Sequence, residues 1–122
     1  MREILFKAKR LDNGECVDGF YCCIGPVGQE KHYIIPMYAS AFYGIEVDPS
    51  TVCQYTGLKD KNGKRIFEGD NVYDPHENSI YTVEWNEDNA IFLMAHDWHR
   101  RSLETAYYCE IIGSIHDGEG GQ

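Results

Sequence analysis

The residues QYTGLKDKNGKRIFEGDNV at positions 54–72 are the most informative part of the sequence, because apolar side chains alternate there with residues that favour tight turns. Asn62-Gly63 tolerates the positive φ that short turns between antiparallel strands require. It therefore predicts a turn that joins a strand over Thr51–Thr56 to a strand over Arg65–Phe67. Glu68-Gly69-Asp70 predicts a further bend, since glycine permits sharp turns and aspartate accepts hydrogen bonds from nearby backbone N–H groups.

The residue types within this stretch indicate structural roles. Tyr55 and Phe67 are predicted to lie in or near the core, and Asp60 and Asp70 are predicted to cap loops. The glycines at 57, 63 and 69 are predicted to serve the turns. Turn residues alternating with apolar side chains are typical of a folding constraint, so we favour this interpretation over a ligand-binding role.

Towards the C-terminus, short apolar segments alternate with polar turns. These segments predict strands at Asn71–Tyr73, Ile80–Trp85, Ala90–Met94 and Tyr107–His116. Residues 95–106 are mixed and polar, and they predict a long loop with some helical character. Several short strands joined by tight turns predict a small SH3-like barrel, because a barrel closes the exposed edges that short strands otherwise present.

Towards the N-terminus, the pattern predicts a β-hairpin. Residues 3–10 alternate as in a strand, Asp12-Asn13-Gly14 predicts a tight turn, and Cys16–Ile24 predicts the returning strand. Tyr33–Ile35 is a short apolar segment that ends at Pro36, whereas Met37–Gly44 fits either a short helix or a strand.

We therefore predict a mainly β chain that folds as one domain over residues 1–122. It would contain an N-terminal β-hairpin subregion over residues 1–50, an SH3-like barrel over 51–117 and a frayed tail over 118–122.

The composition favours a folded protein of a reducing compartment. The chain has 122 residues, of which 43% are hydrophobic and 13% aromatic, as in ordinary folded domains. No segment approaches the roughly 20 apolar residues that cross a bilayer, and the charged N-terminus lacks the apolar region of a signal peptide. The five cysteines are an odd number without a CxxC pair, which is typical of buried or idle thiols in a cytoplasmic protein.

The net charge of −9 is unevenly distributed along the chain. Residues 1–65 contain nine basic and eight acidic residues, whereas residues 66–122 contain two and twelve. Such an acidic half repels phosphate backbones, so nucleic-acid binding through it is disfavoured. Nucleic-acid binding would be favoured only if the basic residues of the first half formed one patch: Lys7, Lys9, Arg10, Lys59, Lys61, Lys64 and Arg65.

The segment His96-Asp97-Trp98-His99 is the most suggestive of metal binding, with Cys109 and His116 nearby in the sequence. Two imidazoles at H-x-x-H spacing can chelate zinc on a helical turn. The segment lacks the Glu of the helical H-E-x-x-H pattern, and the sequence offers no set of four ligands. We therefore expect no metal site and no cofactor.

The candidate nucleophiles stand in no context that activates them. A nucleophilic Ser or Cys needs a His that a carboxylate orients, or a glycine-framed elbow; the residues that lack such a context are Ser79, Ser102, Ser114, Cys53 and Cys109. The loop Gly25-Pro26-Val27-Gly28 lacks the Lys and Ser/Thr of a phosphate-binding loop. We expect no enzymatic activity.

Trp98, Arg100 and Arg101 form the best candidate for an interaction surface. Trp and Arg are the residue types that most often anchor protein interfaces. The alternative interpretation is that Trp98 covers the mouth of the barrel.

Residues 54–64 and 66–72 together resemble the YopX family of bacteriophage and prophage proteins. The opening Met1–Ala8 and the closing Glu110–Asp117 fit the same family, and their order and spacing match a whole chain of this type. The resemblance implies a β-rich fold with an SH3-like barrel in its C-terminal part. It implies phage or prophage origin, hence the cytoplasm of a bacterial host, and it implies no established activity.

These features favour a phage or prophage accessory protein that acts as a non-catalytic protein-interaction module on an unknown host or phage protein. One alternative is a homo-oligomeric structural protein in which the near-neutral half of one copy meets the acidic half of the next. Another is a small barrel that binds nucleic acid, or an acidic mimic of DNA. None of these predictions involves a membrane.

Overall fold

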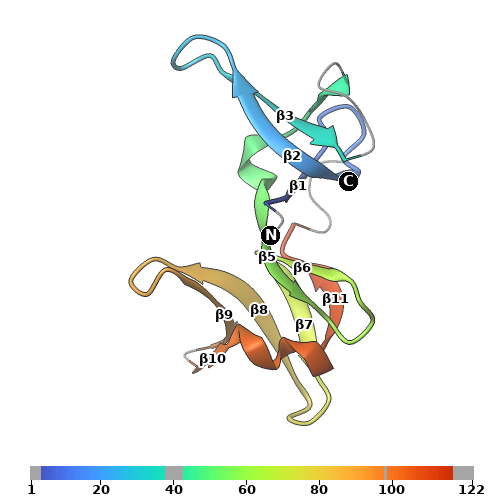
Figure 1. Cartoon of the computed structure of the whole chain (residues 1–122), viewed down its shortest axis with the longest axis vertical. Helices are drawn as coiled ribbons and strands as arrows, with labels where there is room; N and C mark the ends of the chain where they lie inside the picture. Colours follow the sequence, from blue (N-terminus) through green and yellow to red (C-terminus); the bar gives the residue numbers. More distant parts are fainter. Residues whose placement is uncertain (1–3, 38–42, 98, 117–122) are drawn as a thin grey trace. The chain divides into compact units, whose positions relative to one another are not determined.

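The computed structural model describes residues 4–37, 43–97 and 99–116, and it is mainly β, as predicted (Figure 1). The chain divides into two compact units, with the boundary between Gln54 and Tyr55. Met37–Gly44, for which the sequence left helix and strand open, lies largely outside the described residues. Among the described helices, none is long and apolar enough to span a membrane.

The first unit is built on an antiparallel sheet with the strand order β4-β3-β2-β1-β5. The strands are β1 (Phe6–Lys9), β2 (Cys16–Ile24), β3 (Lys31–Pro36), β4 (Ile45–Glu46) and β5 (Cys53–Lys59). β1 and β2 pair around the predicted turn, where the backbone N–H of Gly14 donates to the carbonyl of Arg10 at 2.9 Å and Gly14 adopts a φ of 73°. β5 continues past the unit boundary and pairs there with β6 (Arg65–Phe67).

The core of the first unit lies on one face of this sheet. Ala8, Ile34 and Val47 are buried at its centre, and four partly buried side chains pack against them: Phe6, Val17, Tyr21 and Val52. The hydroxyl of Tyr21 also hydrogen-bonds the Nδ1 atom of His32.

The strand predicted from Thr51 begins later than the sequence indicated. Pro49–Thr51 form a 3₁₀ turn, η2, and β5 starts at Cys53. Asp48 caps this turn by accepting a hydrogen bond from the backbone N–H of Ser50 at 3.0 Å. Pro49 at the first position has the φ that a helical turn needs, so the cap outweighs the β propensity of Thr51.

The second unit contains an antiparallel sheet with the order β10-β9-β8-β7-β11. Its strands are β7 (Asp70–Asp74), β8 (Ser79–Asn86), β9 (Ile91–His96), β10 (His99–Ser102) and β11 (Glu110–Ser114). Alternation along these strands places every second side chain inward. The buried cluster consists of Ile66, Val72, Tyr81, Val83, Met94, Leu103, Ala106 and Cys109.

Most of the roles predicted within residues 54–72 are confirmed, but Gly57 lies inside β5, with a φ of 92°, and not at a turn. Tyr55 and Phe67 are buried, with ring centroids 5.5 Å apart. The carboxylate of Asp60 accepts hydrogen bonds from the N–H groups of Asn62 and Lys64 at 2.9 Å and from that of Ile111 at 3.0 Å. Asp70 accepts a hydrogen bond from the N–H of Phe67 at 2.8 Å. Asp60 therefore closes the predicted turn and also ties it to β11.

The prediction of a long loop with some helical character over residues 95–106 is correct only in its helical part. His99–Ser102 form β10, which pairs with β9, and Leu103–Tyr108 form a 3₁₀ helix, η3. Strand β10 stands at the end of the sheet order, which explains its polar composition. In η3 the buried side chains are Leu103 and Ala106, and Cys109 follows at the same spacing of three. The final strand consequently begins at Glu110, not at Tyr107 as predicted.

We expect Gly19→Ala to destabilise the protein by about 1–3 kcal/mol. Gly19 pairs with Phe6 on one side and Pro36 on the other, and a Cβ atom there would lie 2.2 Å from the carbonyl oxygen of Ile35. Because that oxygen belongs to the backbone, the strands must move apart. Urea unfolding followed by circular dichroism measures the change.

The matched control is Gly44→Ala, in which the new Cβ would meet the Tyr33 side chain at an ordinary 3.5 Å. We expect its free energy of unfolding to stay within about 0.5 kcal/mol of the wild type. Equal effects of the two substitutions would contradict the close approach of β2 and β3.

Candidate functional site

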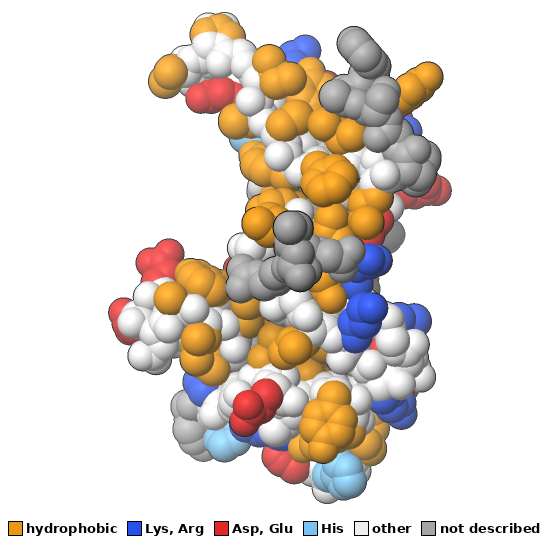
Figure 2. All heavy atoms as spheres, viewed as in Figure 1, with side chains coloured by type: hydrophobic (Ala, Val, Ile, Leu, Met, Phe, Trp, Pro, Cys, Tyr) orange, Lys and Arg blue, Asp and Glu red, His pale blue; other side chains and the backbone are white. Residues whose placement is uncertain are grey.

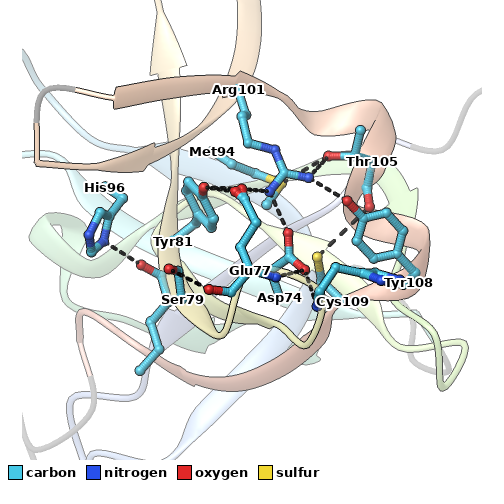
Figure 3. Close-up of polar contacts among 12 residues, drawn as sticks. Asp74, Glu77, Ser79, Tyr81, Met94, His96, Arg101, Thr105, Tyr108 and Cys109 are labelled. Atoms are coloured by element: carbon cyan, nitrogen blue, oxygen red, sulfur yellow. Dashed lines mark hydrogen bonds and ion pairs between the residues drawn. The ribbon is translucent and has the colours of Figure 1, made fainter.

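Arg101 lies at the centre of the most extensive polar cluster among the described residues (Figure 3). Its side chain is only 15% exposed, although it projects from the polar strand β10. Nη1 donates to the carboxylate of Asp74 and, at 3.0 Å, to that of Glu77. Nη2 donates to Thr105 Oγ1 at 2.8 Å and to Tyr108 Oη at 2.6 Å. One guanidinium thus joins β10 to the β7–β8 turn and to η3.

Asp74 is the buried anion of this cluster. Its side chain is 0% exposed, and its Oδ1 accepts hydrogen bonds from the backbone N–H groups of His76 at 2.7 Å and Glu77 at 3.2 Å. Burial by itself would raise the pKa of Asp74, but the hydrogen bond from Arg101 and those from the two N–H groups hold this pKa below its ordinary value. The carboxylate is therefore ionised and fully engaged.

Two tyrosine rings enclose the guanidinium. The Cζ atom of Arg101 lies 5.0 Å from the ring centroid of Tyr81 and 6.0 Å from that of Tyr108, within the range of cation–π attraction. The hydroxyl of Tyr81 donates to both carboxylate oxygens of Glu77, at 2.8 and 2.9 Å. The contact with Arg101 alone would lower the pKa of Tyr81, but burial and the hydrogen bond to Glu77 raise it.

Further aromatic rings extend the cluster to the surface. His76 meets Tyr108 edge-on with centroids 4.6 Å apart, and Tyr107 meets Tyr108 at 5.2 Å. On the other side, the rings of His96 and His99 contact Tyr81 at 5.8 and 6.2 Å. Tyr107 is 70% exposed. We call His76, Tyr107 and Tyr108 the η3 aromatic surface.

The cluster contains one thiol, at Cys109, and burial raises its pKa to about 11. The Sγ atom faces the carbonyl oxygen of Thr105 at 3.8 Å. A thiol with such a pKa is protonated at neutral pH, and the thiolate is the nucleophilic form. The geometry therefore makes Cys109 a packing residue of the core.

The histidines that suggested metal binding have other contacts. His96 Nδ1 lies 3.0 Å from the carbonyl oxygen of Ile80, and His96 Nε2 lies 3.7 Å from Asp97. His99 contacts Tyr81, and His116 follows the end of β11. Within residues 4–37, 43–97 and 99–116, no three His, Cys, Asp or Glu side chains are grouped so as to hold a metal ion.

The predicted interaction residues Trp98, Arg100 and Arg101 have different environments. Trp98 lies outside the described residues. Arg100 is 42% exposed, and its Nε forms an ion pair with Glu84 at 2.6 Å. Arg101 turns inward, because adjacent side chains of a strand point to opposite faces. Its cluster was not predicted, since its partners stand up to 27 residues away in the sequence.

A shallow pocket of about 410 Å³ in the first unit is lined by Arg10, Leu11, Asp12, Gly44, Ile45 and Glu46. Arg10 and Asp12 already form a two-point ion pair there, with distances of 2.9 and 2.7 Å. The cation of the pocket is thus neutralised by its own neighbour.

We expect Arg101→Met to lower the free energy of unfolding by about 3–5 kcal/mol, because it leaves the Asp74 carboxylate buried without its cation. The neighbouring substitution Arg100→Met removes a half-exposed pair and should cost less than about 1 kcal/mol. Urea unfolding of both variants measures the difference. Similar values for the two would show that Arg101 does not hold the cluster together.

The free energy of unfolding should depend on pH through the ionisation of the Asp74 carboxyl group. Because its folded-state pKa lies below the unfolded value of 3.8, the stabilisation is fully present above that pH and is lost as the pH falls through the folded-state pKa. In Asp74→Asn the free energy of unfolding should therefore fall less steeply below pH 4 than in the wild type. Asp88→Asn, on the exposed β8–β9 turn, should keep the wild-type slope. The same slope in Asp74→Asn as in the wild type would show that the Asp74 carboxylate does not supply this pH-dependent stabilisation.

Comparison with known proteins shows which family and which solved fold this chain is similar to. The family model described as YopX protein matches residues 26–119. The crystal structure of protein EF1440 from Enterococcus faecalis is similar over 100% of both chains, with a TM-score of 0.58 and 21% sequence identity, a level that supports a shared fold. Comparison with curated proteins gave no match. Because the family model covers most of the chain, this protein belongs to the YopX family.

Proposed function

We propose that this protein is a non-catalytic protein-interaction module, encoded by a phage or prophage and acting in the cytoplasm of the bacterial host. Membership of the YopX family supports the origin, given the phage and prophage proteins that the sequence resembles. The cysteines support the compartment, because Cys22, Cys23 and Cys109 are free thiols and Cys23 is exposed. Exposed thiols of this kind persist in reducing surroundings.

We infer further that the second unit is a small SH3-like barrel. Its strands follow one another as an antiparallel meander from β7 to β10, and the last strand, β11, returns to pair with β7. The 3₁₀ helix η3 precedes that last strand. These are the elements that a small closed barrel needs in order to protect the edges of short strands.

The observation that supports interaction most directly is the placement of Tyr107. Its ring is 70% exposed yet packs edge-on against Tyr108, and Arg101 and His76 in turn hold Tyr108. A large side chain fixed in this way loses little conformational entropy on binding. Exposed tyrosines that are already held in position are typical anchors of protein interfaces.

Charge indicates the chemistry of the partner. Glu104 stands three residues before Tyr107 in η3, so the two side chains lie on one side of the 3₁₀ helix. The carboxylate of Glu77 remains 41% exposed beside Arg101. Three cations of the second unit already have acidic partners: Arg101 is buried against Asp74, Arg100 pairs with Glu84, and Lys61 lies 3.9 Å from Glu110. We therefore propose that the partner presents a basic segment to the η3 aromatic surface.

The nucleic-acid alternative has one feature in its favour, the basic β5–β6 turn, seen in Figure 2 as a group of Lys and Arg side chains. Lys61 lies 3.9 Å from Glu110, and Arg65 lies over the ring of Tyr55. Only Lys59 and Lys64 of this turn then remain to neutralise phosphates, fewer than the six to ten contacts of tight DNA binding. We therefore favour a protein partner.

The test is affinity capture from the native host, with the wild type, Tyr107→Ala and Ile91→Ala compared by quantitative mass spectrometry. Ile91 is 46% exposed at the opposite end of β9 from His96 and serves as the matched control. We expect one host or phage protein to be retained by the wild type and by Ile91→Ala, and to be reduced at least tenfold with Tyr107→Ala. Its retention should weaken as salt is raised, because exposed charges are screened.

Equal recovery with Tyr107→Ala and the wild type would show that the η3 aromatic surface is not the binding site. Recovery of no protein by the wild type would contradict the proposed function as a whole. Circular dichroism of each variant checks that the fold is retained.

A further inference from the structure

An exposed thiol of the first unit lies directly opposite a histidine. Cys23 on β2 pairs with His32 on β3. The carbonyl oxygen of His32 accepts a hydrogen bond from the N–H of Val47 at 2.9 Å, so the backbone groups of His32 point away from β2. A pair without mutual hydrogen bonds is the narrow one of an antiparallel ladder, with Cα atoms about 4.5 Å apart and side chains close together. The thiol and the imidazole are therefore neighbours on one face of the hairpin.

A tyrosine holds this imidazole in place. The hydroxyl of Tyr21 hydrogen-bonds the Nδ1 atom of His32, and the two rings stack with centroids 5.9 Å apart and an interplanar angle of 13°. Tyr21 packs in turn against the core of the first unit, where its ring centroid lies 5.6 Å from that of Phe6. Because Tyr21 engages Nδ1, the nitrogen that remains for the thiol is Nε2.

Two pKa shifts reflect how close these groups are. Burial raises the pKa of Tyr21, and the charges of thiolates at Cys23 and Cys22 raise it further. Hydrogen bonds from backbone N–H groups lower the pKa of Glu30, and the charge of His32 lowers it further. A carboxylate near an imidazole favours the cationic form of the ring. Glu30 therefore stabilises the state in which His32 has accepted a proton.

The other four cysteines, all within the described residues, have different surroundings. Two of them are buried in the core. Cys22 points to the opposite face of β2 and pairs with Tyr33. Cys16 is exposed and pairs with Lys9, but an ammonium group has no lone pair with which to accept a proton. Only Cys23 combines an exposed side chain with a histidine directly across the ladder.

A thiol beside a base that a third group orients is the arrangement that activates cysteine as a nucleophile. From this geometry we propose that Cys23 is a modification site, at which low-molecular-weight disulfides such as glutathione disulfide form a reversible mixed disulfide. His32 accepts the thiol proton while the Cys23 sulfur attacks one sulfur of the disulfide. The bond between the two disulfide sulfurs breaks, a new S–S bond forms to Cys23, and the released thiolate takes the proton from His32. This site is separate from the η3 aromatic surface and independent of its role.

Incubation of the full chain with glutathione disulfide, followed by peptide mass spectrometry over time, shows which cysteine is modified. Near pH 7 we expect the adduct at Cys23 to form at least about tenfold faster than the adduct at Cys16. Cys23→Ser should lose the fast adduct, whereas Cys16→Ser should retain it. Equal rates at Cys16 and Cys23 in the wild type would overturn the proposal.

The dependence on pH separates proton acceptance by His32 from a purely structural role. Near pH 7, His32→Gln should slow the modification of Cys23 at least about tenfold, and Tyr21→Phe should slow it to a smaller extent. Near pH 9.5 ordinary thiols ionise without a base, so His32→Gln and the wild type should then react equally fast. The matched control is His96→Gln, which removes a half-exposed imidazole of the second unit and should keep the wild-type rate at both pH values.

A wild-type rate in His32→Gln near pH 7, or an equal slowing at both pH values, would overturn the proposal. Circular dichroism checks the fold of each variant. If His32→Gln does not fold, a wild-type rate in Tyr21→Phe near pH 7 would overturn the proposal in its place.

Discussion

The ion pair between Arg101 and Asp74 is the constraint that organises the second unit. A carboxylate with no exposed surface is stable only if a cation and hydrogen-bond donors surround it, and Arg101 with two backbone N–H groups meets that need. For Arg101 to reach the buried carboxylate of Asp74, β10 must lie beside the β7–β8 turn and η3 must pack over the guanidinium. The position of Tyr108, and through it that of Tyr107, follows from this arrangement.

In this arrangement the central groups of the cluster are engaged in structural contacts. The guanidinium of Arg101 is held by four side chains, and burial raises the pKa of the Cys109 thiol to about 11. What remains available at the surface is a rigid aromatic group with acidic neighbours.

The parts of the fold that could be predicted are those encoded locally. Asn62-Gly63 and Gly69-Asp70 specify their turns through φ and hydrogen bonds within a few residues, and β2 ends where alternation gives way to Gly25-Pro26. Strand β10 could not be predicted because its polar residues show no strand period. The sequence indicated η3 only as some helical character, because its inward residues repeat every third position. The Arg101 cluster could not be predicted from the sequence for another reason. Arg100 and Arg101 read as one basic pair in the sequence, and only the pairing of β10 with β9 sends them to opposite faces.

The state of the Arg101 side chain in solution tests this account most directly, and nitrogen-15 NMR of the guanidinium measures it. If Asp74, Glu77, Thr105 and Tyr108 hold Arg101 as the structure shows, rotation about its Nε–Cζ bond is slow. The two Nη groups then give separate signals, with nuclear Overhauser effects to the ring of Tyr108. A single averaged Nη signal that exchanges rapidly with water, without any such effect, would show that the cluster does not form and that η3 owes its position to something else.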